Sequence, residues 1–299
     1  MISPINQTSL KHHDSAFEIL IEQGNIMKKL LWITDAHLDH LSETVKDDWF
    51  EKLAKTRADM LLLGGDTANS RLFCRMLGRI EKVFPGKVAL VAGNHDYYHA
   101  SISDFRATLE VFHRAGTIIF EPGCQSIPLQ LAEGVYLCGS GGWGDASAGC
   151  ADASGMELND EHLIAELRTG NLTARLRELG KESAQHLQEQ LAAVPEDASC
   201  VIVLTHVPPW PESCWHEGRN SDALALPRFC WQAGGNAISQ AAERMPQTRF
   251  IVLCGHTHSD GIWKQGNITC HTAGSAYGRI DHSGIISLGG TVSVRELDR

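Results

Sequence analysis

The chain has few of the features that mark secreted or membrane-inserted proteins. Its nine cysteines lie far apart and form no C-x-x-C pair, and four of them lie within or beside apolar runs, where cysteine behaves as a small hydrophobic residue. No apolar run approaches the ~18 to 20 residues that a membrane-spanning helix needs. The first 26 residues lack the apolar core and the small-residue cleavage site of a secretory signal. We therefore expect reduced cysteines, a cytoplasmic location and no association with a membrane.

Positive charge is also scarce. The chain has 26 Lys and Arg residues against 36 Asp and Glu residues, which gives a formal net charge of -10. This acidic balance disfavours the broad phosphate-tracking surface that nucleic-acid-binding proteins carry, although a local basic groove is compatible with an acidic total. Nucleic acid is therefore an unlikely partner on composition, and the composition leaves the oligomeric state open.

Five short apolar runs each end in residues that commonly bind metal ions. The runs are continuous, rich in aliphatic and β-branched residues, and bounded by glycine or polar residues, which is typical of buried strands. The runs at 30–34, 60–65, 88–93, 200–205 and 250–255 are followed, in that order, by Asp35-Ala36-His37, Asp66, Asn94-His95-Asp96, His206 and His256-Thr257-His258.

Helical patterns alternate with the first of these runs. The spacing of apolar residues predicts helices over about 46–57, 69–83, 101–115 and 172–193. Alternation of strand and helix is typical of an α/β fold. Strand-like runs near the end of the chain, at 268–273, 284–288 and 291–297, suggest a second sheet. The segment 207–229 has no regular pattern and is long enough to be functional.

The five clusters are expected to converge, because ligands in an open α/β sheet bind beyond the carboxyl ends of the strands. Asp35 and His37 lie two residues apart on a segment expected to be extended, so their side chains would project to the same side. His256 and His258 repeat this spacing. Carboxylate, imidazole and amide oxygen form a mixed set of ligands that suits Mn, Fe, Zn, Co or Ni rather than a thiolate-selected metal. We therefore predict a metal site without cysteine ligands.

The clusters contain enough ligands for two ions. One ion could take the Asp and His of the first cluster with one His of the last pair, and the other could take the amide, the lone His and the second His, with one carboxylate bridging both. Two ions about 3.5 to 4 Å apart can share a water, lower its pKa, and stabilise the attacking and leaving oxygens at phosphorus. These candidate metal ligands are Asp35, His37, Asp66, Asn94, His206, His256 and His258.

His95 is left over from this set. It follows the candidate ligand Asn94 directly but would point elsewhere. A histidine in this place can protonate the leaving oxygen or stabilise the charge that develops on the phosphoryl group. We therefore predict that His95 is catalytic.

In this order the motifs resemble the calcineurin-like metallophosphoesterase family, whose pattern is D-x-H, G-D, G-N-H-[DE], a lone His and G-H-x-H. The resemblance implies a four-layer α/β/β/α sandwich of two mixed sheets flanked by helices, with the metal site at the carboxyl ends of the strands. It implies hydrolysis of phosphate mono- or diesters through a metal-bridging hydroxide, with Mn or Fe as the first candidates. It also implies one ion held by Asp35, His37, Asp66 and His258, and the other by Asp66, Asn94, His206 and His256.

Departures from related patterns narrow the substrate class. Protein serine/threonine phosphatases of this superfamily continue their G-D with V-D-R-G, whereas Asp66 is followed here by Thr-Ala-Asn-Ser. The tyrosine ligand of purple acid phosphatases is also missing after Asp66. In several branches an acidic residue three positions after the bridging Asp orients the catalytic His, but Asn69 stands there, so the pairing of His95 is neutral or comes from another residue. The remaining resemblance is to the broad bacterial group that hydrolyses small phosphate esters.

Two other functions compete with this interpretation. A metal-dependent nuclease would use the same chemistry but needs a basic groove, and a non-catalytic protein-binding scaffold would tolerate loss of ligands, none of which is missing.

Several further residues have both a functional and a purely structural interpretation. Asp39 and His40 are extra ligands or part of a solvated loop, the tryptophans stack on a substrate ring or pack, and the arginines bind phosphate or form surface ion pairs. The last two groups are Trp143, Trp210, Trp215, Arg219 and Arg279.

We interpret residues 27–299 as one catalytic domain, since the chain is long enough to build a large core without disulfides. Residues 1–26 are polar, and Met27-Lys28-Lys29 stands directly before the first apolar run. We therefore expect residues 1–26 to be a peripheral extension that the chemistry does not need. A protein that starts at Met27 should keep the metal content of the full chain, measured by elemental analysis, and loss of its metals would contradict this interpretation.

Overall fold

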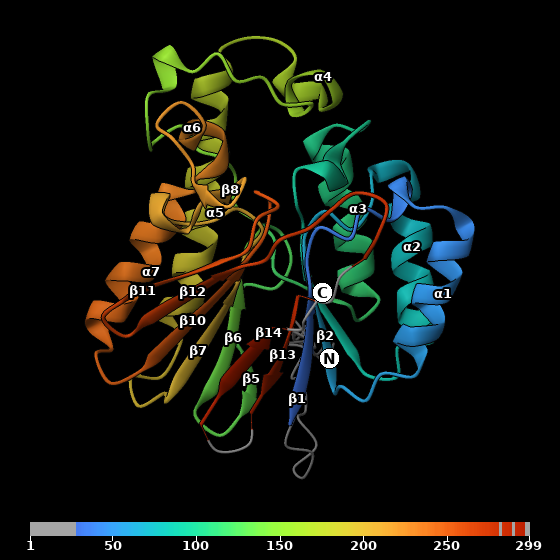
Figure 1. The fold of residues 1–299 in the computed structure, drawn as a ribbon. Helices are drawn as coiled ribbons and strands as arrows, with labels where there is room; N and C mark the ends of the chain where they lie inside the picture. Colours follow the sequence, from blue (N-terminus) through green and yellow to red (C-terminus); the bar gives the residue numbers. More distant parts are fainter. Residues whose placement is uncertain (1–27, 281–282, 289–290, 297–299) are drawn as a thin grey trace, which may run out of the picture.

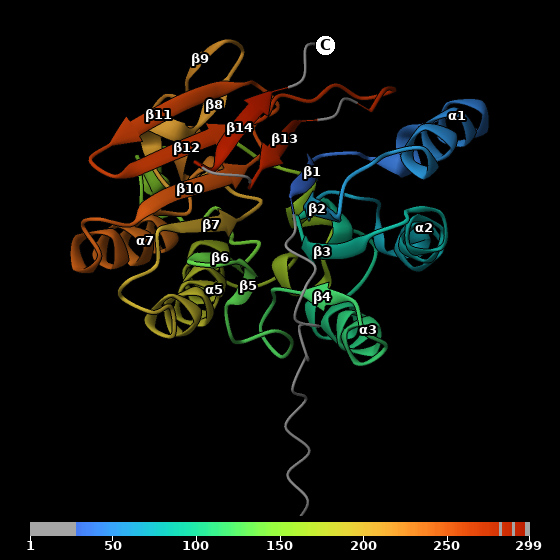
Figure 2. The same cartoon turned by 90° about the horizontal axis from the view of Figure 1, so that it is seen from below.

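The structure, a computed structural model, describes residues 28–280, 283–288 and 291–296. The proposed extension of residues 1–26 lies outside these residues. The described residues form two six-stranded sheets that pack face to face, with helices on both outer faces (Figures 1 and 2). The predicted α/β/β/α sandwich of two mixed sheets is therefore confirmed.

The first sheet has the strand order β14-β13-β1-β2-β3-β4. Strands β1 to β4 are parallel, and β13 pairs antiparallel with β1. Its outer face is covered by three helices, and Ser42 accepts a hydrogen bond from the Val45 N–H at the start of the first of them, three residues earlier than predicted. The elements are β1 (Lys29–Ile33), β2 (Met60–Gly64), β3 (Lys87–Val91), β4 (Ile118–Ile119), β13 (Gly284–Ser287), β14 (Ser293–Glu296), α1 (Glu43–Ala54), α2 (Ser70–Val83) and α3 (Ile102–Arg114).

The second sheet has the order β11-β12-β10-β7-β6-β5, with parallel strands at its centre and an antiparallel strand at each edge. Two helices cover its outer face (Figure 2). In the described part of the chain, no helix combines the length and apolarity that crossing a membrane requires. The elements are β5 (Leu129–Ala132), β6 (Val135–Gly139), β7 (Cys200–Leu204), β10 (Arg249–Cys254), β11 (Gly261–Gln265), β12 (Ile268–Thr272), α5 (Leu172–Ala192) and α7 (Gln232–Arg244).

Short elements lie beyond the carboxyl ends of the central strands. Two of them are helical turns, and two form a small hairpin within the segment 207–229. They are α4 (Asp160–Leu163), α6 (Leu226–Phe229), β8 (Trp215–His216) and β9 (Arg219–Asn220). Figure 1 shows α4 and α6 above the sheets, at the end where the metal-ligand motifs occur.

Both faces of the central strands are buried, which explains their continuous apolar runs. On β1, Leu30 and Trp32 pack between the two sheets, while Leu31 and Ile33 pack against α1 to α3. The second sheet shows the same division, because Ile202 faces the first sheet and its neighbours face α5 and α7. The core therefore fixes each strand in register and brings the strand ends to one edge.

The prediction that the last strands build a second sheet is wrong in part. β12 belongs to the second sheet, but β13 and β14 return to the first sheet, where β13 pairs with β1. Ile286 of β13 is fully buried in the core between the sheets. The apolar pattern specified strands but carried no information about which edge they join.

Helix α7 was not predicted. It begins with a segment rich in glycine and polar residues, which gives a weak helical pattern. The glycines are required by packing, since a Cβ on Gly235 would lie 2.0 Å from the carbonyl oxygen of Pro209, and a Cβ on Gly234 would lie 2.4 Å from the Trp231 ring. Close packing here therefore overrides low helix propensity.

Glu121 links the two sheets below the strand ends. Its side chain is buried, and Oε1 accepts hydrogen bonds from the N–H groups of Ala92, after β3, and Gly141, after β6, both at 2.9 Å. Burial raises the pKa of Glu121 from 4.5 to about 7, although these hydrogen bonds and Arg106 oppose the shift.

The Glu121 carboxyl predicts a pH-dependent stability. Because its pKa is raised in the folded state, the folded protein binds more protons than the unfolded chain between pH 4.5 and about 7, so stability falls as pH rises through this window. Glu121→Gln keeps an oxygen for both N–H groups and cannot ionise. We compare the free energy of unfolding of Glu121→Gln with that of wild type at each pH. We expect this difference to shift in favour of the variant by on the order of 1 to 3 kcal/mol from pH 5 to pH 8.

Urea unfolding of metal-stripped wild type and variant at both pH values measures this difference. Glu133→Gln, which changes an exposed glutamate, is the control. A stability difference between Glu121→Gln and wild type that is the same at pH 5 and pH 8 would contradict the account.

Candidate metal centre

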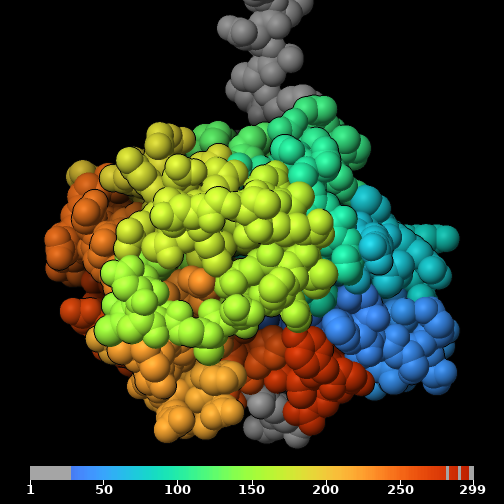
Figure 3. All heavy atoms as spheres, turned by 90° about the horizontal axis from the view of Figure 1, so that it is seen from above, coloured from blue at the N-terminus to red at the C-terminus, as the bar shows by residue number. Residues whose placement is uncertain are grey.

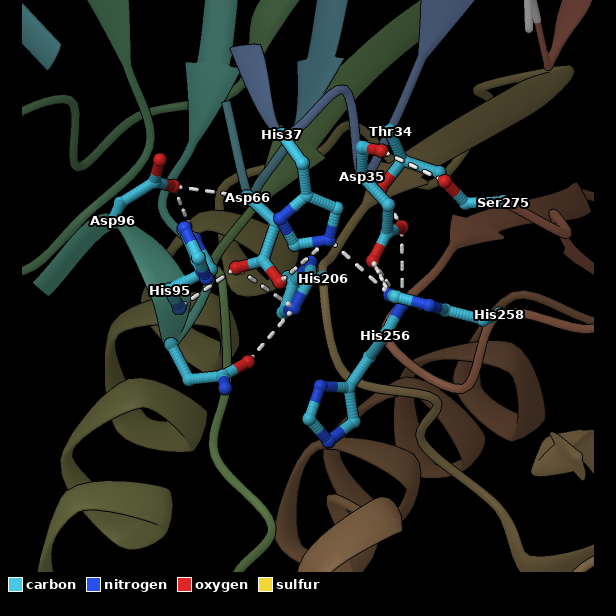
Figure 4. Close-up of polar contacts among 12 residues, drawn as sticks. Thr34, Asp35, His37, Asp66, His95, Asp96, His206, His256, His258 and Ser275 are labelled. Atoms are coloured by element: carbon cyan, nitrogen blue, oxygen red, sulfur yellow. Dashed lines mark hydrogen bonds and ion pairs between the residues drawn. The ribbon is translucent and has the colours of Figure 1, made fainter. Parts of the chain in front are cut away.

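The carboxyl ends of β1, β2, β3, β7 and β10 meet at one edge of the sandwich, and the residues after them point toward one another (Figure 4). Four of the predicted ligands form the tightest group, because each offers one ligand atom and these atoms all lie within 4.8 Å of one another. Three of the four are buried, and the fourth is partly exposed. They are Asp35, His37, Asp66 and His258.

The loops that present the ligands are not extended, which corrects the expectation for residues 35–37. Asp35 and His37 have φ angles of 52° and 41°, in the left-handed region that non-glycine residues rarely adopt. Asp66, His256 and His258 also have positive φ. Hydrogen bonds between neighbouring strand ends hold these turns, including the Asp35 N–H to the Gly65 oxygen at 3.0 Å and the His37 N–H to the Asp66 oxygen at 2.9 Å. Such strained backbone is characteristic of functional sites.

The first group of ligands is compact and rich in lone pairs. The Nε2 atoms of His37 and His258 are 3.2 Å apart, and His258 Nε2 is 3.3 Å from Asp35 Oδ1. His37 Nε2 is 3.7 Å from Asp66 Oδ2. Burial lowers the pKa of His37 to about 3, so its ring is neutral and can act as a ligand. Burial opposes ionisation of Asp35, but the hydrogen bond with His258 and the nearby His206 keep its pKa below the usual range.

A second group surrounds the other oxygen of Asp66. His206 Nδ1 lies 3.0 Å from the Gly64 carbonyl oxygen, which can only accept, so Nδ1 carries the proton. The unprotonated Nε2 then faces Asn94 Oδ1 at 3.1 Å and Asp66 Oδ1 at 3.4 Å. Burial and the nearby Asp35 raise the pKa of Asp66, but neither His206 Nε2 nor Asn94 Oδ1 has a proton to share, and the three atoms together fit a shared cation.

His256 lies beside this group, with its ring centroid 5.1 Å from that of His206. Its Nε2 donates to the Arg228 carbonyl oxygen at 3.0 Å, so Nδ1 is the nitrogen with a free lone pair (Figure 4). Burial lowers the pKa of His256 to about 3. Backbone carbonyls therefore fix the tautomers of both His206 and His256 in the form that a metal ion needs.

Asp160 of α4 orients the amide of Asn94, a role that the sequence did not suggest. Asn94 Nδ2 donates to Asp160 Oδ1 at 2.7 Å, which turns Asn94 Oδ1 toward His206. The Tyr98 hydroxyl donates to the same Asp160 oxygen at 2.7 Å. Burial raises the pKa of Asp160, and the bonds from Tyr98 and Asn94 oppose this shift.

Asp96, the last residue of the third motif, supports the turn after β2. Its carboxylate accepts hydrogen bonds from the N–H groups of Gly93, Asp66, Thr67 and Ala68 at 2.8 to 3.0 Å. Burial raises the pKa of Asp96 to about 6, although these bonds favour the ionised form. Asp96 thus positions Asp66 without belonging to either group of ligands.

Asp39 pairs with His95, and the expectation that Asp39 lies in a solvated loop is wrong. His95 Nε2 is 2.8 Å from Asp39 Oδ2, and both side chains are 7% exposed. Asn69 Nδ2 donates to the same carboxylate oxygen at 2.7 Å. Burial would raise the pKa of Asp39, but the hydrogen bond with His95 lowers it to about 2. The carboxylate that pairs with His95 therefore comes from a residue two positions after the first motif, and Asn69 holds it in place.

The aromatic residues considered for substrate stacking pack inside the protein. Trp143 is buried against Tyr97, with ring centroids 5.2 Å apart, and Trp210 is buried against Trp263 at 4.7 Å. Trp215 is half-buried and packs on Gly261. Arg219 lies exposed on the hairpin of β8 and β9.

The family model for calcineurin-like phosphoesterases matches residues 28–260. The chain belongs to this family. The predicted resemblance is thereby confirmed, and the protein is a metal-dependent phosphoric ester hydrolase by class. Among curated protein sequences, none matches the chain.

Solved structures show the same fold. The crystal structure of phosphopantetheinyl hydrolase from Mycobacterium tuberculosis is 14% identical, with a TM-score of 0.62, over 84% of this chain and 90% of that chain. A dimetal phosphatase from Danio rerio is 12% identical, with a TM-score of 0.56, over 91% of this chain and 97% of that chain. At these identities the similarity establishes the architecture alone.

Proposed function

We propose that this calcineurin-like phosphoesterase hydrolyses phosphate mono- or diesters of small molecules with two metal ions. The observation that carries the proposal is the arrangement of His206, Asn94 and Asp66, whose lone pairs face one another at 3.1 to 3.4 Å with the proton of His206 held on the opposite side. Without a cation the contact between His206 Nε2 and Asn94 Oδ1 is repulsive, because neither atom carries a proton. The same carboxylate of Asp66 also faces His37, which supports a bridging role.

Each ion has a complete set of ligands in this proposal. Manganese and iron suit the mixed oxygen and nitrogen donors, and zinc, cobalt or nickel also fit. When bound, such ions lower the pKa of a water and polarise phosphoryl oxygens. The first ion is assigned to Asp35, His37, Asp66 and His258, and the second to Asp66, Asn94, His206 and His256.

His95 is assigned the transfer of a proton to the leaving oxygen. Its backbone N–H donates to Asp66 Oδ1 at 2.8 Å, which places it at the junction of the two groups of ligands. Its Nε2 lies 2.8 Å from Asp39 Oδ2, so the carboxylate fixes the orientation of the ring. Asp39 is therefore a positioning residue for His95.

Asp39→Asn is expected to lower kcat about 10- to 100-fold with little change in KM or metal content, because an amide makes a weaker hydrogen bond to the His95 ring than a carboxylate does and orients it less firmly. The loss should be larger for alkyl phosphates, whose leaving oxygen needs a proton, than for p-nitrophenyl phosphate. Steady-state kinetics on both substrates measure it, with the exposed Asp48→Asn as control. An equal loss on both substrates would argue that Asp39 has only a structural role.

The proposed function is tested by initial rates of the manganese-loaded protein on p-nitrophenyl phosphate and on its bis-ester, beside a metal-stripped control. A preference for the bis-ester would indicate phosphodiester substrates, and a preference for the mono-ester would indicate phosphomonoesters. Absence of any metal-dependent rate on either ester would favour the non-catalytic scaffold. Cleavage of single-stranded oligonucleotides in preference to both esters would favour the nuclease.

We also propose a cytoplasmic location. All nine cysteines are free, and six of the seven that follow residue 130 are buried, where burial raises the thiol pKa of Cys138, Cys200 and Cys254. Protonated, buried thiols are compatible with a reducing compartment. Alkylation of the protein in cell extracts under native and denaturing conditions would measure their redox state.

A further inference from the structure

Tyr277 contacts two of the candidate metal ligands and remains exposed to solvent. Its ring centroid lies 4.6 Å from that of His37 and 5.3 Å from that of His258, both assigned to the first ion. Tyr277 nevertheless remains 59% exposed, among the most exposed large hydrophobic residues of the described chain. A large ring that contacts two metal ligands and keeps most of its surface in water is available to a bound molecule.

The exposed part of Tyr277 is a phenol ring. It offers a flat apolar face and a hydrogen-bond donor.

His40 continues this surface toward His95. The ring centroids of His40 and Tyr277 are 4.9 Å apart, and those of His40 and His95 are 5.3 Å apart. The His40 side chain is 47% exposed, and its Nε2 lies 3.6 Å from Asp39. The rings of Tyr277, His40 and His95 thus form a continuous row from solvent to the proposed proton donor.

The segment that contains α4 covers one side of the centre. Figure 3, which looks down on the centre, shows the segment that contains α4 lying across this face in yellow-green. The segment that contains Tyr277, in red, and the segment that contains His40, in blue, border it on the opposite side. Asp160 and Glu161 of α4 are both engaged, with Asn94 and with Arg228 respectively.

We propose that Tyr277 and His40 form the subsite for the leaving group, and that this subsite favours esters whose leaving group is a planar ring. The inference rests on the proposed function, because it follows from the role of His95. A histidine that protonates the leaving oxygen must lie beside it, so the group attached to that oxygen extends along His40 and Tyr277. An aryl or nucleobase ring can pack on their exposed faces, whereas a short alkyl chain covers little of them.

Binding of two unreactive phosphonates tests the subsite independently of turnover. Isothermal titration calorimetry would compare phenylphosphonate with methylphosphonate on the manganese-loaded full chain. We expect wild type to bind phenylphosphonate more tightly, and Tyr277→Ala to weaken that binding about 2- to 10-fold while leaving methylphosphonate unchanged. Tyr277→Phe should retain most of the preference, and His40→Ala should lose part of it. Ile127→Ala, which alters a residue that is also 59% exposed, is the matched control.

Four results would overturn the subsite. Tyr277→Ala could weaken both phosphonates by the same factor, which would mean that Tyr277 only shields the ligands, or it could change neither. Wild type could also fail to prefer phenylphosphonate or bind neither compound. The proposed function is judged separately by metal-dependent turnover of wild type on p-nitrophenyl phosphate, so a protein that turns over this ester but shows no effect of Tyr277→Ala refutes the subsite alone.

Discussion

Asp66→Ala should remove both metal ions and abolish metal-dependent hydrolysis. Asp66 is the one carboxylate that faces both groups of ligands, since Oδ1 lies 3.4 Å from His206 Nε2 and Oδ2 lies 3.7 Å from His37 Nε2. The substitution removes one ligand from each proposed ion. Without the ions, several buried imidazoles and the Asp35 carboxylate lose the positive charge that they share. Elemental analysis of the purified variant should find well under one ion per chain, whereas we expect two for wild type.

A milder substitution separates loss of metal from loss of folding, because alanine tolerates the φ of 52° at this position less well than asparagine does. Asp66→Asn keeps the side-chain oxygen that accepts the His95 N–H and should fold like wild type by circular dichroism. It cannot supply a bridging carboxylate and should also lose metal, with Asp48→Asn as the surface control. A folded Asp66→Asn that retains two ions would refute the bridging role.

His95→Ala should keep both ions and lose about 10² to 10⁴-fold in turnover, the range for removal of a general acid. The N–H that positions Asp66 belongs to the backbone of residue 95 and survives the substitution, so the ligands should stay in place. The loss should be greatest on esters with a poor leaving group. Metal content, kcat and KM measured on the same preparation separate this result from loss of the site.

His162→Ala, which alters an exposed histidine of α4, provides the control for this experiment. Unchanged turnover of His95→Ala with both metals in place would remove His95 from the mechanism. Loss of metal from His95→Ala would instead assign it a role in holding the centre.

The fold, and the meeting of the seven candidate ligands at one edge, could be predicted because each of these residues follows a buried strand. A short apolar run predicts a strand without knowledge of its partners, and the carboxyl ends of parallel strands meet at one edge whatever the strand order. Asp66, His206 and His256 come from three different strands, yet their convergence needs only this rule. The order of strands is less accessible, because β13 and β14 join the first sheet through pairing that spans most of the chain.

Residues that contact His95 or the candidate ligands were harder to predict from the sequence. Asp39 stands in a short polar stretch that is typical of a surface loop, and its partner His95 is 56 residues away. Asp160 lies in a segment without any pattern, and its bond to Asn94 exists because α4 folds over the centre. Tyr277 is an isolated aromatic in a polar loop. Such contacts depend on how loops pack, which apolar periodicity does not encode.

The central claim is that two ions, held by one shared set of side chains, are needed for hydrolysis. The most direct test is a titration of the metal-stripped protein with Mn²⁺, in which bound metal and the rate of p-nitrophenyl phosphate hydrolysis are measured at each step. We expect the rate of hydrolysis to stay low until the second equivalent of Mn²⁺ binds, and to reach its maximum at two ions per chain. Full activity with one ion per chain, or two bound ions without any hydrolysis of the ester, would contradict it.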